Sequence, residues 1–390
     1  MRAQDLGRKL TTVQGGAEPW VEIHGRRLLN LSSNNYLGLA HHPAVIAAAV
    51  EATKEYGCGA GSSRLVAGTG YLHTELELRL ARFKGVERTL LFTSGYTANV
   101  GLIPALVGPG DLVIGDELNH ASLIDGCRLS RADFRRFPHR DVAALDRQLD
   151  QAQRDSHEGR KLVVTDTVFS MDGDVSPLAA IADVCERHGA MLMVDEAHAT
   201  GCLGPGGRGL VAELGLEDQI TASMSTLSKA LGVFGAFVAG EAILADYLAT
   251  VARSFMFTTA LPPSVVAASL AALDVLEQEP DLPLRLQSNA SFLREGLRDA
   301  GFDTLGSETH IVPILVGESA LALRFAERLR EEGVFAVAIR PPTVPPGAAR
   351  IRLSAMASHT TDELRGAVEA IARVGHELGV SSKQVRRNGA

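Results

Sequence analysis

Between residues 86 and 240, short runs of β-forming residues alternate with segments of helix length. This alternation is typical of a mostly parallel sheet with helices on both faces, because parallel strands need a crossover connection between them. Polar residues directly after the strands are the first place to look for a ligand site, since open α/β sheets bind ligands at the carboxyl ends of their strands. The six runs are Thr89–Thr93, Leu112–Gly115, Leu162–Thr165, Met191–Asp195, Thr221–Met224 and Ala236–Ala239.

The segments on either side of this region predict an arm before it and a smaller domain after it. Trp20–Leu31 is predicted to form a hairpin that turns at His24-Gly25, and Pro43 to open a helix. From about residue 280, helices alternate with strands at His310–Val316 and Arg350–Ser354. We therefore expect an N-terminal arm (1–42), a large domain (43–278), a small α+β domain (279–380) and a disordered tail (381–390).

Charge and composition narrow the functional class. The 38 Lys and Arg residues face 46 Asp and Glu, a formal charge of -8 at pH 7, which disfavours binding to nucleic acid or to an anionic membrane. Met1–Leu10 lacks the apolar core of a secretory signal, and no apolar run approaches the roughly 18 residues of a membrane span. We therefore expect a cytoplasmic protein. No metal site or disulfide is expected, because the four cysteines are scattered without a CxxC pair: Cys58, Cys127, Cys185 and Cys202.

The run from Thr226 to Gly232 places Lys229 among small and hydroxyl residues directly after a predicted strand. In a partly dry pocket, desolvation lowers the pKa of a lysine and leaves its amine free to condense with an aldehyde. Thr226, three residues earlier, is placed to contact a phosphate. The alternative is a lysine at a helix start whose ammonium group extends into solvent.

In the run from Val194 to His198, an apolar strand ends in the carboxylate of Asp195. A carboxylate there can hold a proton on a pyridine nitrogen, as pyridoxal 5'-phosphate (PLP) requires, with His198 within reach of the ring oxygen. The alternatives are a capping aspartate and the DEAH box of helicases, whose acid holds magnesium. The sequence has no Gly-Lys dipeptide, so the phosphate-binding loop of a helicase is missing.

Three further polar motifs follow predicted strands. Thr93–Asn99 passes through a glycine into a helix, where backbone N–H groups can bind a phosphate, although an ordinary turn has the same pattern. His120 is either a residue that stacks on a flat cofactor ring or a structural histidine. Ser170 offers a hydroxyl, or belongs to an ordinary Asp- and Gly-rich turn. Gly204–Gly209 formally fits GxGxxG but lies well beyond its nearest strand, so dinucleotide binding is not expected.

Together the motifs resemble those of the PLP-dependent α-oxoamine synthases of fold type I, over almost the whole chain. The resemblance implies an α/β fold: a large domain with a mostly parallel seven-stranded sheet covered by helices, and a smaller C-terminal α+β domain. The matching runs are Asn34–Gly38, Gly61–Arg64, Ser94–Tyr96, Asn119–Ser122, Phe169–Gly173, Asp195–His198 and Thr226–Lys229.

The resemblance also implies roles for individual residues. Three would be catalytic: Lys229 would bond to the PLP aldehyde and act as the acid/base, Asp195 would pair with the pyridinium, and His120 would stack on the ring and contact substrate. His198 would bond the ring oxygen. The remaining cofactor contacts would come from Gly95, Tyr96, Ser170, Thr226 and, across the interface of a homodimer with a shared active site, Thr259.

Members of this family release CO2 while they join an amino acid to an acyl thioester. By resemblance, Asn34 and Arg352 would bind the amino-acid carboxylate, the arginine through two hydrogen bonds; the alternative for Arg352 is a surface position at a sheet edge. The run Arg340–Pro345 is most similar to members that condense L-alanine with pimeloyl-CoA or pimeloyl-acyl carrier protein in biotin synthesis, and Thr343 would contact substrate. Members that join glycine to acetyl-CoA usually lack this run.

Two features bear on the acyl specificity. Members that use the pimeloyl group often carry an arginine near the N-terminus, for which this chain offers Gly7-Arg8-Lys9, and Asn35 stands where many of them carry Asp. A different class of function, a PLP-type fold that serves only as a regulatory subunit, would lack the lysine or carry a fused DNA-binding module. This chain has Lys229 and shows no such module.

Overall fold

The computed structural model describes residues 7–8 and 10–380, so the tail predicted at 381–390 lies outside the described residues. The described chain divides into two compact units. The larger unit comprises His42–Phe169 and Ser176–Pro280, and the smaller unit comprises the residues before His42, the segment Ser170–Val175 and the residues from Asp281. No helix in the described ranges is both long and apolar enough to cross a membrane.

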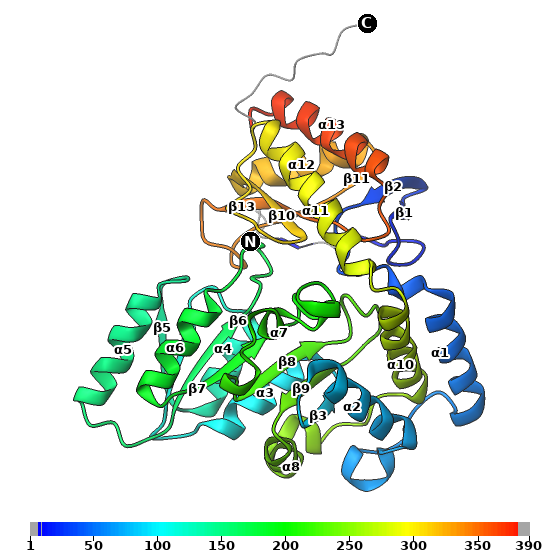
Figure 1. Ribbon diagram of the computed structural model, residues 1–390. Coiled ribbons are helices and arrows are strands. Elements are labelled where there is room, and N and C mark those ends of the chain that lie inside the picture. Colours follow the sequence, from blue (N-terminus) through cyan, green and yellow to red (C-terminus); the bar gives the residue numbers. More distant parts are fainter. Residues whose placement is uncertain (1–6, 9, 381–390) are drawn as a thin grey trace, which may run out of the picture. The chain divides into compact units, whose positions relative to one another are not determined.

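A seven-stranded sheet forms the centre of the larger unit (Figure 1). All neighbouring strands are parallel except β9, which is antiparallel to both of its neighbours. The predicted mostly parallel sheet is therefore confirmed, and its central strands are continuously buried, as expected when helices cover both faces. In spatial order the strands are β3 (Arg88–Phe92), β9 (Ala236–Gly240), β8 (Ala222–Thr226), β7 (Met191–Asp195), β6 (Lys161–Asp166), β4 (Leu112–Asp116) and β5 (Asp133–Phe137).

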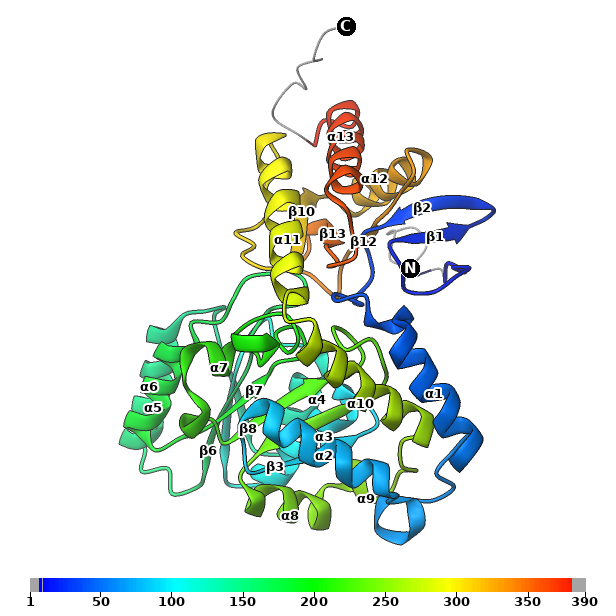
Figure 2. The ribbon, with the colours of Figure 1, turned by 45° about the vertical axis from the view of Figure 1, so that its right-hand side comes forward.

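Helices lie on both sides of this sheet (Figure 2). One buried apolar cluster joins the sheet to α3, α4, α8 and α9, and includes Leu102, Leu123 and Phe255. Sequence signals set several helix starts: Pro43 opens α1, and the Ser94 side chain caps α3 by accepting a hydrogen bond from the Thr97 backbone N–H. The helices are α1 (Pro43–Tyr56), α2 (Tyr71–Lys84), α3 (Gly95–Leu106), α4 (Ala121–Ser130), α5 (Val142–Arg154), α6 (Leu178–His188), α7 (Leu210–Leu214), α8 (Ala242–Val251), α9 (Arg253–Met256) and α10 (Pro263–Gln278).

Within its described residues, the smaller unit contains two three-stranded sheets and three α-helices. The predicted hairpin is present, and both His24 and Gly25 adopt the positive φ that a tight turn between β1 and β2 requires. Because β2 also pairs with β11, the arm joins this unit. The elements are β1 (Trp20–Ile23), β2 (Arg26–Asn30), β10 (Ile311–Gly317), β11 (Val334–Phe335), β12 (Val337–Ile339), β13 (Ala349–Ser354), α11 (Leu282–Asp299), α12 (Ser319–Glu331) and α13 (Thr361–Glu377).

Candidate active site

A cavity of about 190 Å³ opens in the larger unit. It lies where the carboxyl ends of several parallel strands meet, because Asp166, Asp195 and Thr226 are the last residues of β6, β7 and β8. Sequence reasoning pointed to this edge of the sheet, and seven predicted site residues line the cavity: Gly95, Tyr96, His120, Asp195, His198, Thr226 and Lys229.

Asp195 is buried, and two donors hold its carboxylate in place. Its Oδ1 accepts a hydrogen bond from the backbone N–H of Ala197 at 2.9 Å, and its Oδ2 accepts one from Asn99 Nδ2, also at 2.9 Å. Donors aimed at a carboxylate stabilise its charged form. The sequence motif predicted Asp195 but missed Asn99, whose only signal is polarity on a helix that is otherwise apolar at its buried positions.

A second buried carboxyl group, Asp166, lines the same cavity and was not predicted. Burial, reinforced by the charge of Asp195, raises the pKa of Asp166 well above its usual range. Two carboxyl groups that share a dry site do not both ionise readily, and the raised pKa of Asp166 favours its protonated form. Its Oδ2 also accepts a hydrogen bond from the backbone N–H of His120 at 2.7 Å, which fixes the start of α4.

The cavity's amine comes from Lys229, whose Nζ lies 3.5 Å from Thr226 Oγ1. Thr226 in turn faces the N-terminus of α3, since a Cβ added at Gly95 would lie 2.7 Å from Thr226 Cγ2. Only glycine keeps this space open. The first N–H groups of a helix lack partners within the helix, so this space suits an anionic group.

His120 and Tyr96 stand at the mouth of the cavity, and both are exposed. The Tyr96 hydroxyl donates a hydrogen bond to Asp125 Oδ2 at 2.8 Å, and this bond raises the pKa of the tyrosine. Desolvation lowers the pKa of His120, so its ring is neutral at neutral pH.

In the smaller unit, the predicted pair Asn34 and Arg352 is brought together. Arg352 is buried, and its Nη1 donates to Asn34 Oδ1 at 3.3 Å. Further donations run to the Ser170 carbonyl at 2.6 Å, to Ser354 Oγ at 3.0 Å and to the Tyr36 hydroxyl at 3.3 Å. Arg352 therefore faces the interior of its unit and is not a surface residue at a sheet edge.

The remaining predicted residues lie outside the cavity. Ser170 belongs to the smaller unit, where its carbonyl accepts from Arg352. Thr343 is also there, and its Oγ1 accepts a hydrogen bond from Arg8 Nη2 at 2.9 Å, which selects Arg8 from the basic residues near the N-terminus. Thr259 forms an isolated bridge with Ser63 in the larger unit, and its role toward a second subunit stays a prediction.

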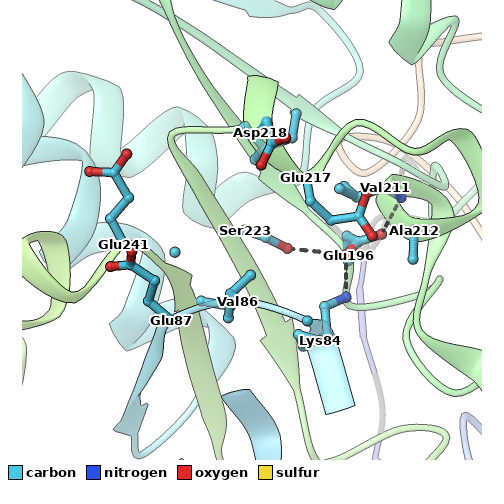
Figure 3. Close-up of a pocket in the computed structure, with 14 residues that line it drawn as sticks. Lys84, Val86, Glu87, Glu196, Val211, Ala212, Glu217, Asp218, Ser223 and Glu241 are labelled. Atoms are coloured by element: carbon cyan, nitrogen blue, oxygen red, sulfur yellow. Dashed lines mark hydrogen bonds and ion pairs between the residues drawn. The ribbon is translucent and has the colours of Figure 1, made fainter. Parts of the chain in front are cut away.

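Another cavity, of about 320 Å³, lies in the larger unit beside a buried ion pair (Figure 3). Lys84 Nζ, at the end of α2, lies 2.5 Å from Glu196 Oε2, and both side chains are at most 4% exposed. Glu196 also accepts hydrogen bonds from Ser223 Oγ and from the backbone N–H of Val211, each at 3.1 Å. Both carboxylate oxygens of Glu196, the second acid of the Asp-Glu-Ala-His run, are thus engaged by protein groups.

Comparison with known proteins identifies the family. Residues 26–371 match the profile of the class I and II aminotransferases. The chain belongs to this family. It is 53% identical over 382 residues to 8-amino-7-oxononanoate synthase of Geobacter sulfurreducens, with 97% of each chain covered. The family and fold predicted from the sequence are therefore confirmed.

Solved structures support the same assignment. Serine palmitoyltransferase from S. paucimobilis with bound PLP–myriocin aldimine matches with a TM-score of 0.92 at 35% identity, over 95% of this chain and 93% of that one. An 8-amino-7-oxononanoate synthase from Francisella tularensis matches with a TM-score of 0.77 at 29% identity, over 90% of this chain and 98% of that one. The fold predicted from the sequence is thus shared with enzymes of known structure.

Proposed function

We propose that this chain is a PLP-dependent acyltransferase of biotin biosynthesis. It condenses L-alanine with a pimeloyl thioester, carried by CoA or by acyl carrier protein, and gives 8-amino-7-oxononanoate, CO2 and the free thiol. The observation that supports this most is the single cavity that gathers Lys229, Asp195 and His120 in a chain 53% identical to an 8-amino-7-oxononanoate synthase.

The residues around the cavity fit PLP. The cofactor has a pyridine nitrogen, a phenolic oxygen, an aldehyde and a phosphate, and the cavity offers a partner for each. These are the buried carboxylate of Asp195, the imidazole of His198, the amine of Lys229, and the N-terminus of α3 with its open space at Gly95. When bound, PLP supplies an electron-accepting ring that stabilises negative charge at the amino-acid Cα.

Each side chain at the cavity has its own role in the proposed reaction. Lys229 anchors the cofactor aldehyde and moves the proton at the substrate Cα. With PLP bound, Asp195 would hold a proton on the pyridine nitrogen, and His120 would lie against the ring and contact substrate. His198 bonds the phenolic oxygen. The cofactor is positioned further by Gly95, Tyr96, Ser170 and Thr226.

The smaller unit supplies the substrate-binding side chains. Asn34 and Arg352 bind the amino-acid carboxylate. Arg352 already makes four donations within its unit, so a two-bond grip on a carboxylate requires it to exchange a weak partner, Asn34 or Tyr36, each at 3.3 Å. Thr343 contacts the acyl substrate.

The protein acts in the cytoplasm as a homodimer with shared active sites. In this arrangement Thr259 contributes a hydroxyl to the phosphate site of the second subunit.

The choice between L-alanine and glycine tests the proposal directly. We expect the visible absorbance of the PLP-loaded protein to respond at lower L-alanine than glycine, and CO2 to be released only when L-alanine and a pimeloyl thioester are both present. Acetyl-CoA with glycine is the matched control pair. A lower half-saturation for glycine, with turnover on acetyl-CoA, would move the assignment to the glycine branch of the family.

Arg8 is expected to bind the free carboxylate at the end of the pimeloyl chain, since it lies beside Thr343 in the same unit. Replacing Arg8 with alanine should raise KM for pimeloyl-CoA about 10-fold, the loss typical of one hydrogen bond to a charged group, and leave kcat nearly unchanged. Arg26→Ala, at another exposed arginine of this unit, is the control. An acyl-CoA without a terminal carboxylate should not distinguish the Arg8 variant from wild type; a difference there would contradict the assignment.

A further inference from the structure

Asn99 and Ser122 connect two functional side chains of the cavity. Asn99 Nδ2 donates one hydrogen bond to Asp195 Oδ2 at 2.9 Å and a second to Ser122 Oγ at 2.8 Å. Ser122 Oγ lies 2.7 Å from His120 Nδ1. Asn99 and Ser122 are essentially unexposed, at 0% and 1%, so solvent does not compete with the two bonds that Asn99 donates.

The direction of each bond follows from its neighbours. If the Asn99 amide were flipped, its oxygen would face an oxygen of the Asp195 carboxylate with no proton between them. The carboxylate therefore fixes the amide so that its NH2 group points toward both Asp195 and Ser122. The other end of the same amide supports this orientation, because Asn99 Oδ1 is buried and has no partner among the described residues. The Asn99 amide is therefore held by the two hydrogen bonds that its NH2 group donates.

The orientation of the amide fixes the proton of Ser122. Since Ser122 Oγ accepts from Asn99, its own hydrogen is free to point at His120 Nδ1. A second donor meets the same nitrogen, because the backbone N–H of Ser122 lies 3.3 Å from Nδ1, with His120 as the N-cap of α4. A backbone N–H can only donate, so this longer contact adds to the 2.7 Å bond from the Ser122 hydroxyl in favouring an Nδ1 that carries no proton.

We propose that Asn99 and Ser122 are positioning residues that fix the proton of the His120 imidazole on Nε2 and couple its orientation to Asp195. Asparagine suits this position because its NH2 group donates twice from one nitrogen, which neither Asp nor Leu can do. The position of the His120 proton does not depend on which reaction the protein catalyses. The use of that proton as a hydrogen-bond donor toward a molecule bound in the cavity rests on the proposed function.

The position of the His120 proton is measured directly from ¹⁵N spectra of protein that carries ¹⁵N-labelled histidine, with and without PLP. A His120→Gln spectrum assigns the signal among the 12 histidines. We expect the neutral ring to show a protonated Nε2 and an unprotonated Nδ1. A proton on Nδ1 would overturn the proposal, even if the enzyme is active as proposed.

Two variants test the relay itself. In Asn99→Asp, the new carboxyl group shares a buried site with Asp195, so one proton lies between the two, and the oxygen that replaces Nδ2 accepts from Ser122 instead of donating to it. The Ser122 hydroxyl then accepts from His120, so we expect the neutral His120 proton to move to Nδ1. Adding Ser122→Ala cuts the relay but keeps the new carboxyl group, so the proton should return to Nε2. A folded Asn99→Asp protein that keeps its proton on Nε2 would contradict the relay.

Ser122→Ala alone keeps the test decisive if Asn99→Asp does not fold. It removes the 2.7 Å donor to Nδ1, so the His120 pKa should rise toward its ordinary value, and an unchanged titration would rule the relay out. Charged groups that act on the ring are the same in this variant and in wild type, so they cancel in the comparison: Asp195, Lys229 and Asp125.

Discussion

Replacing Lys229 with alanine is expected to lower the rate of product formation at least about 1000-fold, because one amine both anchors the cofactor and moves the substrate proton. Nothing else described on the rim of the cavity can take over, since the other lining side chains that titrate are carboxyl groups, histidines and a tyrosine. The measurement is the rate of CO2 release with L-alanine and pimeloyl-CoA at saturating PLP.

Two controls separate this effect from a loss of structure. Lys54→Ala, at an exposed lysine of α1 that pairs with Glu51, should keep the wild-type rate. The unfolding temperature of Lys229→Ala is measured beside that of cofactor-free wild type, so that a loss of folded protein is distinguished from a loss of catalysis. A Lys229→Ala protein that turns over substrate at the wild-type rate would contradict the catalytic role of Lys229.

The sequence predicted the strands of the large sheet well but missed β5 (Asp133–Phe137). The edge position alone does not explain this, because β3 lies at the other edge of the sheet and is apolar and mostly buried. In β5 only Phe137 is buried, and its sequence, Asp-Phe-Arg-Arg-Phe, has no continuous apolar stretch. A strand that is mostly outside the core does not carry the apolar run by which the other strands were found.

The candidate site divides in the same way. Residues that end a strand, such as Asp195 and Thr226, are visible in the sequence because polarity follows an apolar run abruptly. Asn99 and Lys84 contact their partners across 96 and 112 residues of chain, and no spacing rule predicts such contacts. The sequence left open which basic residue near the N-terminus contacts the substrate. The hydrogen bond between Arg8 and Thr343 in the structure points to Arg8.

The buried pair Lys84–Glu196 gives the largest expected effect on stability. Replacing Lys84 with methionine leaves the Glu196 carboxylate buried without its counter-ion, so we expect the free energy of unfolding to fall by about 3–5 kcal/mol. Chemical denaturation of PLP-free protein measures this change without a contribution from bound cofactor. The same substitution at Lys54, whose pair with Glu51 is exposed, should cost less than about 1 kcal/mol.

A double variant distinguishes the buried charge from lost packing. In Lys84→Met with Glu196→Gln, the amide oxygen can accept from the backbone N–H of Val211 and the NH2 group can donate to Ser223 Oγ, so stability should recover toward wild type. If packing of the lysine stem were the cause, the double variant would be at least as unstable as Lys84→Met alone. Wild-type stability of Lys84→Met itself would show that the pair contributes nothing. In that case its two remaining donors, Ser223 and the backbone N–H of Val211, would be enough to hold the Glu196 carboxylate.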